Sequence, residues 1–164
     1  GPVGQRVARL LAGLGVTVKL ASRSLERSTE VCEKLQARLP EAKLSAIQTS
    51  SPAETLESLA GSQLVIAAGA AGVELLSRDV RTQASELRVA IDLNAVPPVG
   101  IAGVEQGDKA KERDGQIGYG ALGVGGTKMK IHRAALQKLF SANNLVLDAE
   151  EILAIGQELE AAAS

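Results

Sequence analysis

The first residues of the chain could bind a phosphate group. Gly1 and Gly4 have the spacing of the last two glycines in a G-x-G-x-x-G fingerprint, and an apolar helical pattern follows over residues 5–14. In this fingerprint the backbone approaches a pyrophosphate, which the free N–H groups of the helix N-terminus stabilise. A plain tight turn would also explain two glycines before a helix. The fingerprint interpretation puts its first glycine and the preceding strand upstream of residue 1, and predicts pyrophosphate contacts from Gly1, Pro2, Val3 and Gly4.

A second motif, Ser22-Arg23-Ser24, lies about twenty residues after the glycines, at the end of the strand predicted over 16–21. A site for NAD would have an acidic residue here to accept hydrogen bonds from the ribose hydroxyls. An arginine between two serines instead suits the 2′-phosphate of NADP, although a solvated loop cation would look the same. The motif favours NADP as the cofactor, with Ser22, Arg23 and Ser24 around its 2′-phosphate.

Two further candidate stretches follow buried strands. Small residues end the strand predicted over 63–68, where a bulky side chain would strike a ribose; close helix packing explains them nearly as well. Asp92 and Asn94 follow the strand predicted over 88–92, and we assign Asn94 a candidate role beside the nicotinamide or the substrate. A turn in which these side chains bond their own backbone is the alternative. The predicted cofactor contacts here are Ala67, Ala68, Gly69 and Asn94.

The last candidates lie in and after a glycine-rich run at 118–126. Gly123 is a predicted cofactor contact. Lys128 and Lys130 fall in the first turn of a helix predicted over 127–140, where cations oppose the helix dipole, so Lys128 is a second catalytic candidate, for an anionic substrate group. A solvated helix edge is the alternative. His132 is interpreted as a helix-packing residue rather than a catalytic one, and Cys32 as a core residue. One histidine and one cysteine do not make a usual transition-metal site, so no metal is predicted.

Composition narrows the function classes. The chain has 164 residues, a net charge of −1 and one tyrosine and one phenylalanine as its aromatics, so neither nucleic acid nor an anionic membrane is an expected partner. A single cysteine fits a reducing compartment, and we expect a cytoplasmic protein. The length suits one domain with a real core.

Strand and helix patterns alternate along the chain. Helices are predicted over 5–14, 25–39, 51–61, 73–87, 127–140 and 148–160, and strands over 16–21, 42–49, 63–68 and 88–92. A glycine-spaced loop is expected from Leu93 to Gly118. Such alternation predicts a parallel sheet with right-handed crossovers. The fold class is therefore a doubly wound α/β sheet of Rossmann type, lacking its first strand.

Four segments carry a family resemblance: AAGAAGVELL, IDLNAVPPVGI, GALGVGGTKMKIHRAALQKLF and LDAEEI. Together with GPVGQRVARLLA and SRS, they resemble the NADP-dependent methylene-tetrahydromethanopterin/methylene-tetrahydrofolate dehydrogenases of bacterial one-carbon metabolism. The likeness covers nearly the whole chain in order. The D-x-N-A-x-P-P-x-G and G-A-L-G-x-G-G-x-K-x-K-x-H-R strings are specific, whereas the glycine fingerprint is not.

The resemblance implies an oxidoreductase that transfers a hydride from the methylene carbon of a reduced pterin to NADP. It implies that residues 1–164 are the NADP-binding domain, that an N-terminal pterin-binding domain and the first strand are absent, and that this piece alone is inactive. The implied partner is a tetrahydropterin, and we expect a homo-oligomer at full length.

Two alternatives stay open. Another NADP-dependent dehydrogenase domain, of the shikimate dehydrogenase or glutamyl-tRNA reductase type, shares the arginine-containing turn but lacks the GALGVGGTKMKIHR string. A non-catalytic NADP-binding module is the other alternative.

Overall fold

The computed structural model describes residues 1–163. The chain folds as two compact units, Gly1–Gly123 and Val124–Ser164, and each is described separately. Unit 1 holds four helices and six strands, in the order α1 (Pro2–Gly13), β1 (Val18–Ser22), α2 (Leu25–Gln36), β2 (Leu44–Gln48), α3 (Pro52–Leu59), β3 (Leu64–Ala67), α4 (Arg78–Gln83), β4 (Val89–Asp92), β5 (Lys111–Arg113) and β6 (Gln116–Tyr119). Unit 2 holds α5 (Gly125–Leu139) and α6 (Ala149–Ala161).

Local signals explain where most helices begin. Pro2 is suited to the first turn of a helix, and α1 begins there, three residues before the predicted start, so that Gly4 lies inside the helix. The Ser24 side chain caps α2, and Ser51 and Glu54 form the capping box expected at α3. Asp148 and Glu151 form a second capping box at α6.

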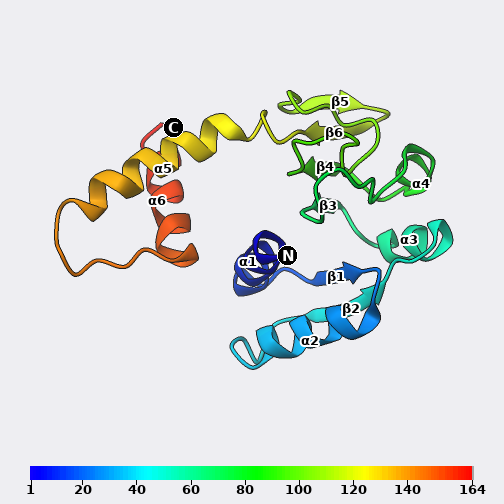
Figure 1. Cartoon of the computed structure of the whole chain (residues 1–164), viewed down its shortest axis with the longest axis horizontal. Helices are drawn as coiled ribbons and strands as arrows, with labels where there is room; N and C mark the ends of the chain where they lie inside the picture. Colours follow the sequence, from blue (N-terminus) through cyan, green and yellow to red (C-terminus); the bar gives the residue numbers. More distant parts are fainter. Residues whose placement is uncertain (164) are drawn as a thin grey trace. The chain divides into compact units, whose positions relative to one another are not determined.

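The strands form two sheets in unit 1 (Figure 1). β1 pairs with β2 in parallel, with Val18 opposite Leu44. The other sheet has the order β3-β4-β6-β5, and its first three strands are parallel. Among residues 1–163, no strand pairing joins β1 to β3. Leu64 at the start of β3 is 39% exposed, so the prediction that this strand is buried along its length is wrong there.

The predicted loop between Leu93 and Gly118 contains a β-hairpin, which corrects the sequence prediction. Asp114 and Gly115 form a two-residue turn with φ of +52° and +79°, and β5 and β6 pair antiparallel on either side. Positive φ at both central residues is the geometry that Asp-Gly favours in hairpins. Because β6 also pairs with β4, the hairpin extends the parallel sheet.

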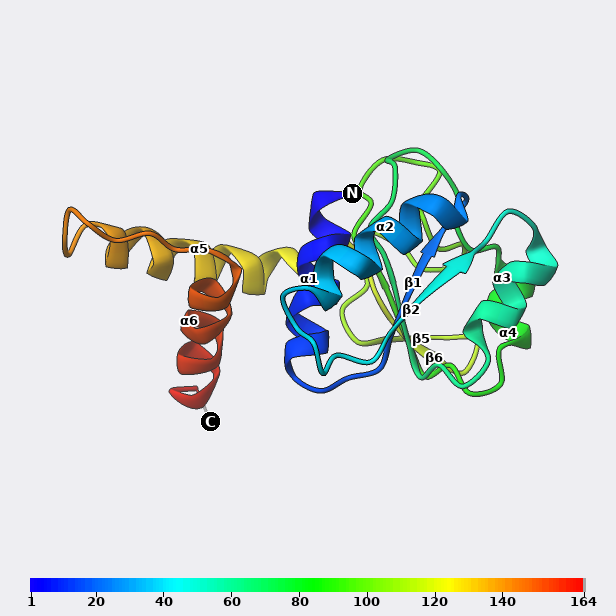
Figure 2. The same cartoon turned by 90° about the horizontal axis from the view of Figure 1, so that it is seen from below.

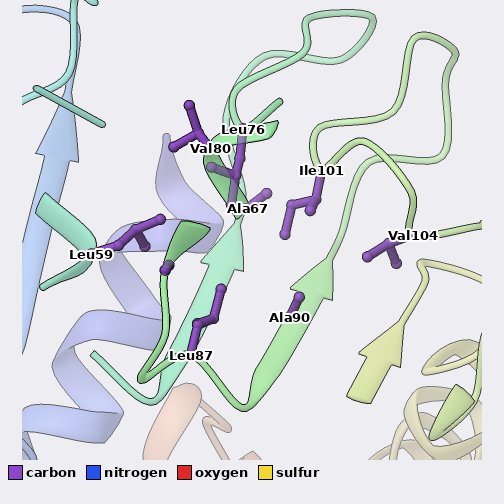
Figure 3. Close-up of a cluster of buried hydrophobic side chains, with 9 residues drawn as sticks. Leu59, Ala67, Leu76, Val80, Leu87, Ala90, Ile101 and Val104 are labelled. Atoms are coloured by element: carbon purple, nitrogen blue, oxygen red, sulfur yellow. The ribbon is translucent and has the colours of Figure 1, made fainter. Parts of the chain in front are cut away.

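The core of unit 1 lies around β3 and β4 (Figure 3). The apolar series that predicts a helix over 73–87 is Val73, Leu76, Val80, Ala84 and Leu87; the last four are buried and Val73 is half-buried. The helix predicted over 73–87 is nevertheless wrong at both ends, because α4 covers only Arg78–Gln83. Leu76 instead forms a parallel bridge with Ile101, so the segment before Ser77 is held by β-type hydrogen bonds.

Unit 2 is a helical hairpin. α5 and α6 pack against each other, and Figure 2 shows α6 running across the direction of α5. Ala135 on α5 and Ile155 on α6 are its buried residues. Among residues 1–163, no helix has both the length and the apolar character that a bilayer crossing requires.

Candidate functional site

The N-terminus of α1 lies beside the carboxyl end of β3. A Cβ placed on Gly4 would lie 3.6 Å from Ala68 Cβ, and one on Gly1 would lie 3.8 Å from Ala68 O. Both distances are ordinary contacts, so packing within the chain does not require glycine at either position. No side chain caps the α1 N-terminus. The structure therefore brings Gly1 and Gly4 together with Ala68 and leaves the first turn without a side-chain acceptor.

Asp92 and Asn94 lie at the carboxyl end of the neighbouring strand, β4. Asp92 is buried, and its carboxylate accepts hydrogen bonds from the backbone N–H groups of Asn94 and Ile101, each at 2.9 Å. The alternative expected from the sequence, a carboxylate that bonds its own loop, therefore holds for Asp92. It does not account for the Asn94 side chain, which is 7% exposed and whose buried Nδ2 has no hydrogen-bond partner among the described residues.

Gly100 lies directly against this pair of side chains. A Cβ on Gly100 would come within 2.3 Å of Asn94 Nδ2, 2.9 Å of Asp92 Oδ1 and 3.2 Å of Ala67 Cβ. Real Cβ atoms do not approach other atoms this closely, so only glycine fits while Asn94 holds its position. Gly100 is the last residue of the D-x-N-A-x-P-P-x-G string, but the string alone predicts no role for it, because its contact partners lie six or more residues away.

The loop after β3 is hydrogen-bonded to Gly100. Gly100 O accepts hydrogen bonds from the N–H groups of Leu75 at 2.8 Å and Leu76 at 3.0 Å. A Cβ on Gly72 would lie 3.7 Å from Pro97 O. The predicted contacts Ala67, Ala68 and Gly69 therefore share one edge of the sheet with Asn94 and with the α1 N-terminus.

Ser22, Arg23 and Ser24 lie at the carboxyl end of β1, as predicted. Ser22 Oγ accepts a hydrogen bond from the Ser24 N–H at 3.2 Å, and Ser24 Oγ accepts one from the Arg27 N–H at 3.4 Å. Both hydroxyl oxygens thus support the turn into α2, and both O–H groups can still donate. Arg23 is exposed.

Other predicted residues lie elsewhere. Gly123 ends unit 1, where a Cβ would come within 1.7 Å of Asp108 O, so close backbone packing accounts for this glycine. Lys128 is exposed near the start of α5, in unit 2. His132 is also exposed, so its interpretation as a packing residue is wrong. Cys32 is partly buried, and this burial raises the pKa of its thiol.

A second buried polar cluster, which the sequence analysis missed, surrounds Arg81. This residue is fully buried and forms an ion pair with Asp114. Its Nη1 donates to Gln116 Oε1 at 2.6 Å and to Arg113 O at 3.2 Å, and its Nε donates to Ala102 O at 3.2 Å. A hydrogen bond from Arg78 and, to a smaller extent, one from Arg81 hold the pKa of the Asp114 carboxyl below its usual range.

A neighbouring ion pair holds the loop before the hairpin. Arg113 makes a bidentate contact with Asp108, with distances of 2.8 and 2.6 Å, and this contact lowers the pKa of the Asp108 carboxyl. The Glu105 N–H also donates to Asp108 at 2.8 Å. With every named polar group bonded, these charged residues hold the loop and the hairpin together.

The described residues fit a dinucleotide. The α1 N-terminus offers N–H groups to an anion, Arg23 offers an exposed cation, and the buried Asn94 amide lacks an acceptor. The chain is a mixed α/β protein with mostly parallel strands, compatible with a Rossmann-like fold.

Two curated proteins of Methylorubrum extorquens are similar to this chain. The bifunctional protein MdtA is 40% identical over 145 residues, which cover 88% of this chain and 50% of MdtA. The NAD(P)-dependent methylenetetrahydromethanopterin dehydrogenase is 31% identical over 117 residues, which cover 70% of this chain and 39% of that enzyme. The chain thus spans half or less of the length of the curated relatives it matches. No family model matches the chain.

Proposed function

We propose that this chain is the NADP-binding part of a dehydrogenase that takes a hydride from the methylene carbon of a methylene-tetrahydropterin, which is either methylene-tetrahydromethanopterin or methylene-tetrahydrofolate. The observation that carries the proposal is the gathering of the α1 N-terminus, Ala68 and Asn94 at one edge of the parallel strands. Ligands of open α/β sheets bind outside the carboxyl ends of the strands. The similarity to a methylenetetrahydromethanopterin dehydrogenase supports the substrate class.

The proposed fold is a doubly wound sheet with one further strand between β1 and β3. Both strands carry an edge that pairs with nothing among residues 1–163. With a strand inserted there, the order of the parallel strands becomes the one that doubly wound dinucleotide-binding sheets have. In this proposal residues 1–164 form one NADP-binding domain, and the further strand and a pterin-binding domain come from other residues of the protein.

Residue roles follow from position. Gly1, Pro2, Val3 and Gly4 bind the pyrophosphate with backbone N–H groups where they have one, and Arg23 binds the 2′-phosphate with a hydroxyl from Ser22 or Ser24. Asn94 lies beside the reacting rings. NADP supplies the hydride acceptor when it is bound. The carbon that loses hydride lies between two nitrogens that stabilise the resulting cation, so no side chain of this chain has to move a proton.

Coenzyme discrimination tests the proposal. The protein, expressed from its complete reading frame, is assayed for NADPH formation with methylene-tetrahydromethanopterin and with methylene-tetrahydrofolate. Replacing Arg23 with Asp should weaken NADPH binding about 30- to 1,000-fold and leave NADH binding nearly unchanged, because only NADPH carries the 2′-phosphate.

The matched control is Arg38→Asp, which makes the same charge change at an exposed arginine beyond the other end of α2. This variant should bind both coenzymes like the unaltered protein. Equal losses for NADPH and NADH in Arg23→Asp would contradict the 2′-phosphate assignment. Absence of turnover with both pterins would contradict the proposed reaction.

A further inference from the structure

The buried Nδ2 of Asn94 forms no hydrogen bond within the described residues. The backbone N–H of Asn94 already satisfies Asp92 Oδ1, and any residue would supply that N–H. The other oxygen of the Asp92 carboxylate accepts a hydrogen bond from the Ile101 N–H, so each of its oxygens has a backbone partner. A buried amide with an unpaired N–H costs free energy, and such groups in native proteins usually have a partner.

The surroundings hold this amide in place. Gly100 fits against it only because it lacks a Cβ, and Gly100 O is fixed by the N–H groups of Leu75 and Leu76. Ala67, the last residue of β3, closes the other side of Gly100. The chain thus positions an unsatisfied amide at the carboxyl ends of β3 and β4.

The geometry points to recognition of a planar amide edge of the ligand by Asn94, with Gly100 as a positioning residue. A side-chain amide presents a donor and an acceptor side by side, and its complement is a ring substituent or lactam that presents an acceptor and a donor in one plane. This inference rests on the proposed function, whose two reactants both carry such an edge: the carboxamide of the nicotinamide and the pyrimidinone of the pterin.

If the ligand supplies the hydrogen-bond partner of Asn94 Nδ2, replacing Asn94 should affect the stability of the ligand-free protein and the affinity for the ligand in opposite ways. Asn94→Leu removes the unpaired group from the ligand-free protein, so the midpoint of thermal unfolding should stay unchanged or rise. Ligand affinity should fall about 10- to 100-fold, because the ligand's acceptor then loses its donor. Asn94→Ala, which is too small to strike Gly100, provides the same comparison if leucine does not fit.

Gln106→Leu is the matched control. Gln106 lies in the loop after the same strand, and its Nε2 donates to Ala95 O at 2.8 Å. Removing this satisfied amide should lower the unfolding midpoint and leave ligand affinity unchanged. The pair of variants thus separates an amide that serves the fold from one that serves the ligand.

The experiment uses the protein expressed from its complete reading frame, with calorimetric titration and thermal unfolding of each variant. The probes are NADP, 2′-phospho-ADP-ribose, which lacks the nicotinamide, and tetrahydrofolate. Loss of affinity for NADP but not for 2′-phospho-ADP-ribose identifies the nicotinamide carboxamide as the partner. Loss for tetrahydrofolate alone identifies the pterin ring.

Two results would overturn the inference while leaving the proposed function intact. One is unchanged affinity for all three probes in both Asn94 variants. The other is a loss of ligand-free stability in Asn94→Ala as large as that in Gln106→Leu. If the unaltered protein binds none of the probes, the proposed function fails and the inference fails with it.

Discussion

Unit 1 contains two buried polar clusters that differ in how completely their groups are bonded. Around Arg81, the Nε and both Nη atoms of a fully buried guanidinium donate to a carboxylate, a side-chain amide and two carbonyl oxygens. Around Asn94, the carboxylate of Asp92 is satisfied, but the adjacent Nδ2 has no partner among the described residues.

This difference distinguishes a polar cluster whose hydrogen bonds stabilise the fold, around Arg81, from one that keeps a donor available to a ligand, around Asn94. Arg81 lies against the turn of the hairpin, far in sequence from the residues that bond it, and links α4 to β6 through Gln116. Among residues 1–163 the Asn94 Nδ2 bonds to no other group, and Asn94 lies where parallel sheets bind ligands. A satisfied cluster should therefore be costly to remove, and an unsatisfied one should not.

The largest expected effect comes from breaking the satisfied cluster. Arg81→Leu should lower the free energy of unfolding by about 3 kcal/mol, since Gln116 and two carbonyl oxygens lose their donor and the leucine leaves a cavity. Urea unfolding followed by circular dichroism measures the change. Arg81→Lys should recover little, because an ammonium group lacks the planar fork. A loss no larger than that of an exposed substitution would show that the cluster contributes little.

A smaller loss should follow from crowding the unsatisfied cluster. Gly100→Ala places a methyl group on Asn94 and Asp92, and should cost about 1–3 kcal/mol of unfolding free energy. Gly107→Ala is the control: its Cβ would meet nothing within 4 Å, and its φ is not in the left-handed region. Equal stabilities of the two variants would mean that Gly100 is not sterically required.

The smallest effect distinguishes the clusters by pH. Hydrogen bonds from arginine lower the pKa of Asp108 and of Asp114 in the folded chain. A carboxyl with a lowered folded pKa contributes stability above its unfolded pKa of about 3.9, and this contribution is lost as the pH falls through the folded pKa. The free energy of unfolding should therefore drop below about pH 4.

The same pH titration can be repeated on two variants, one at the Arg113–Asp108 ion pair and one at Asn94. Asp108→Asn should flatten the acid limb of the profile in part, because one of the carboxyls with a lowered pKa is gone while those of Asp114, Glu30 and Glu54 remain. Asn94→Leu should run parallel to the unaltered protein, since an amide does not titrate. Parallel profiles for Asp108→Asn would show that the Arg113 contact does not link stability to pH.

Much of the fold was predictable, because its signals are local. Capping serines, Pro2 and Pro52 mark helix starts, and continuous apolar runs mark β3 and β4. The hairpin was missed although Asp114-Gly115 is a strong turn signal, because β5 and β6 are only three and four residues long and every residue of β5 is charged. The helix predicted over 73–87 was too long. Leu76 is buried because it forms a β-bridge with Ile101, and its spacing from Val80 happens to match that of a buried helix face.

The candidate site was predictable only where position in the sheet decides it. Asn94 and Ala67–Ala68 follow strands, so their place at the carboxyl edge could be predicted. Gly100 lies in the D-x-N-A-x-P-P-x-G string, but its contact with Asn94 could not be predicted from that spacing, and Arg81 lies in no motif because its partners are distant in sequence. The role of Gly123 in packing against Asp108 is likewise a property of the folded chain.

The two hydrogen bonds accepted by Gly100 O join the loop after β3 to the loop after β4. Residues 75 and 76 donate to it, and the Ala102 N–H donates back to Leu76 O at 2.9 Å, so neither loop can be displaced alone. A displacement of the first loop reaches the Asn94 amide through Gly100. Any effect that a ligand at one loop has on the affinity for a ligand at the other loop would have to be reciprocal, with the same factor in both directions.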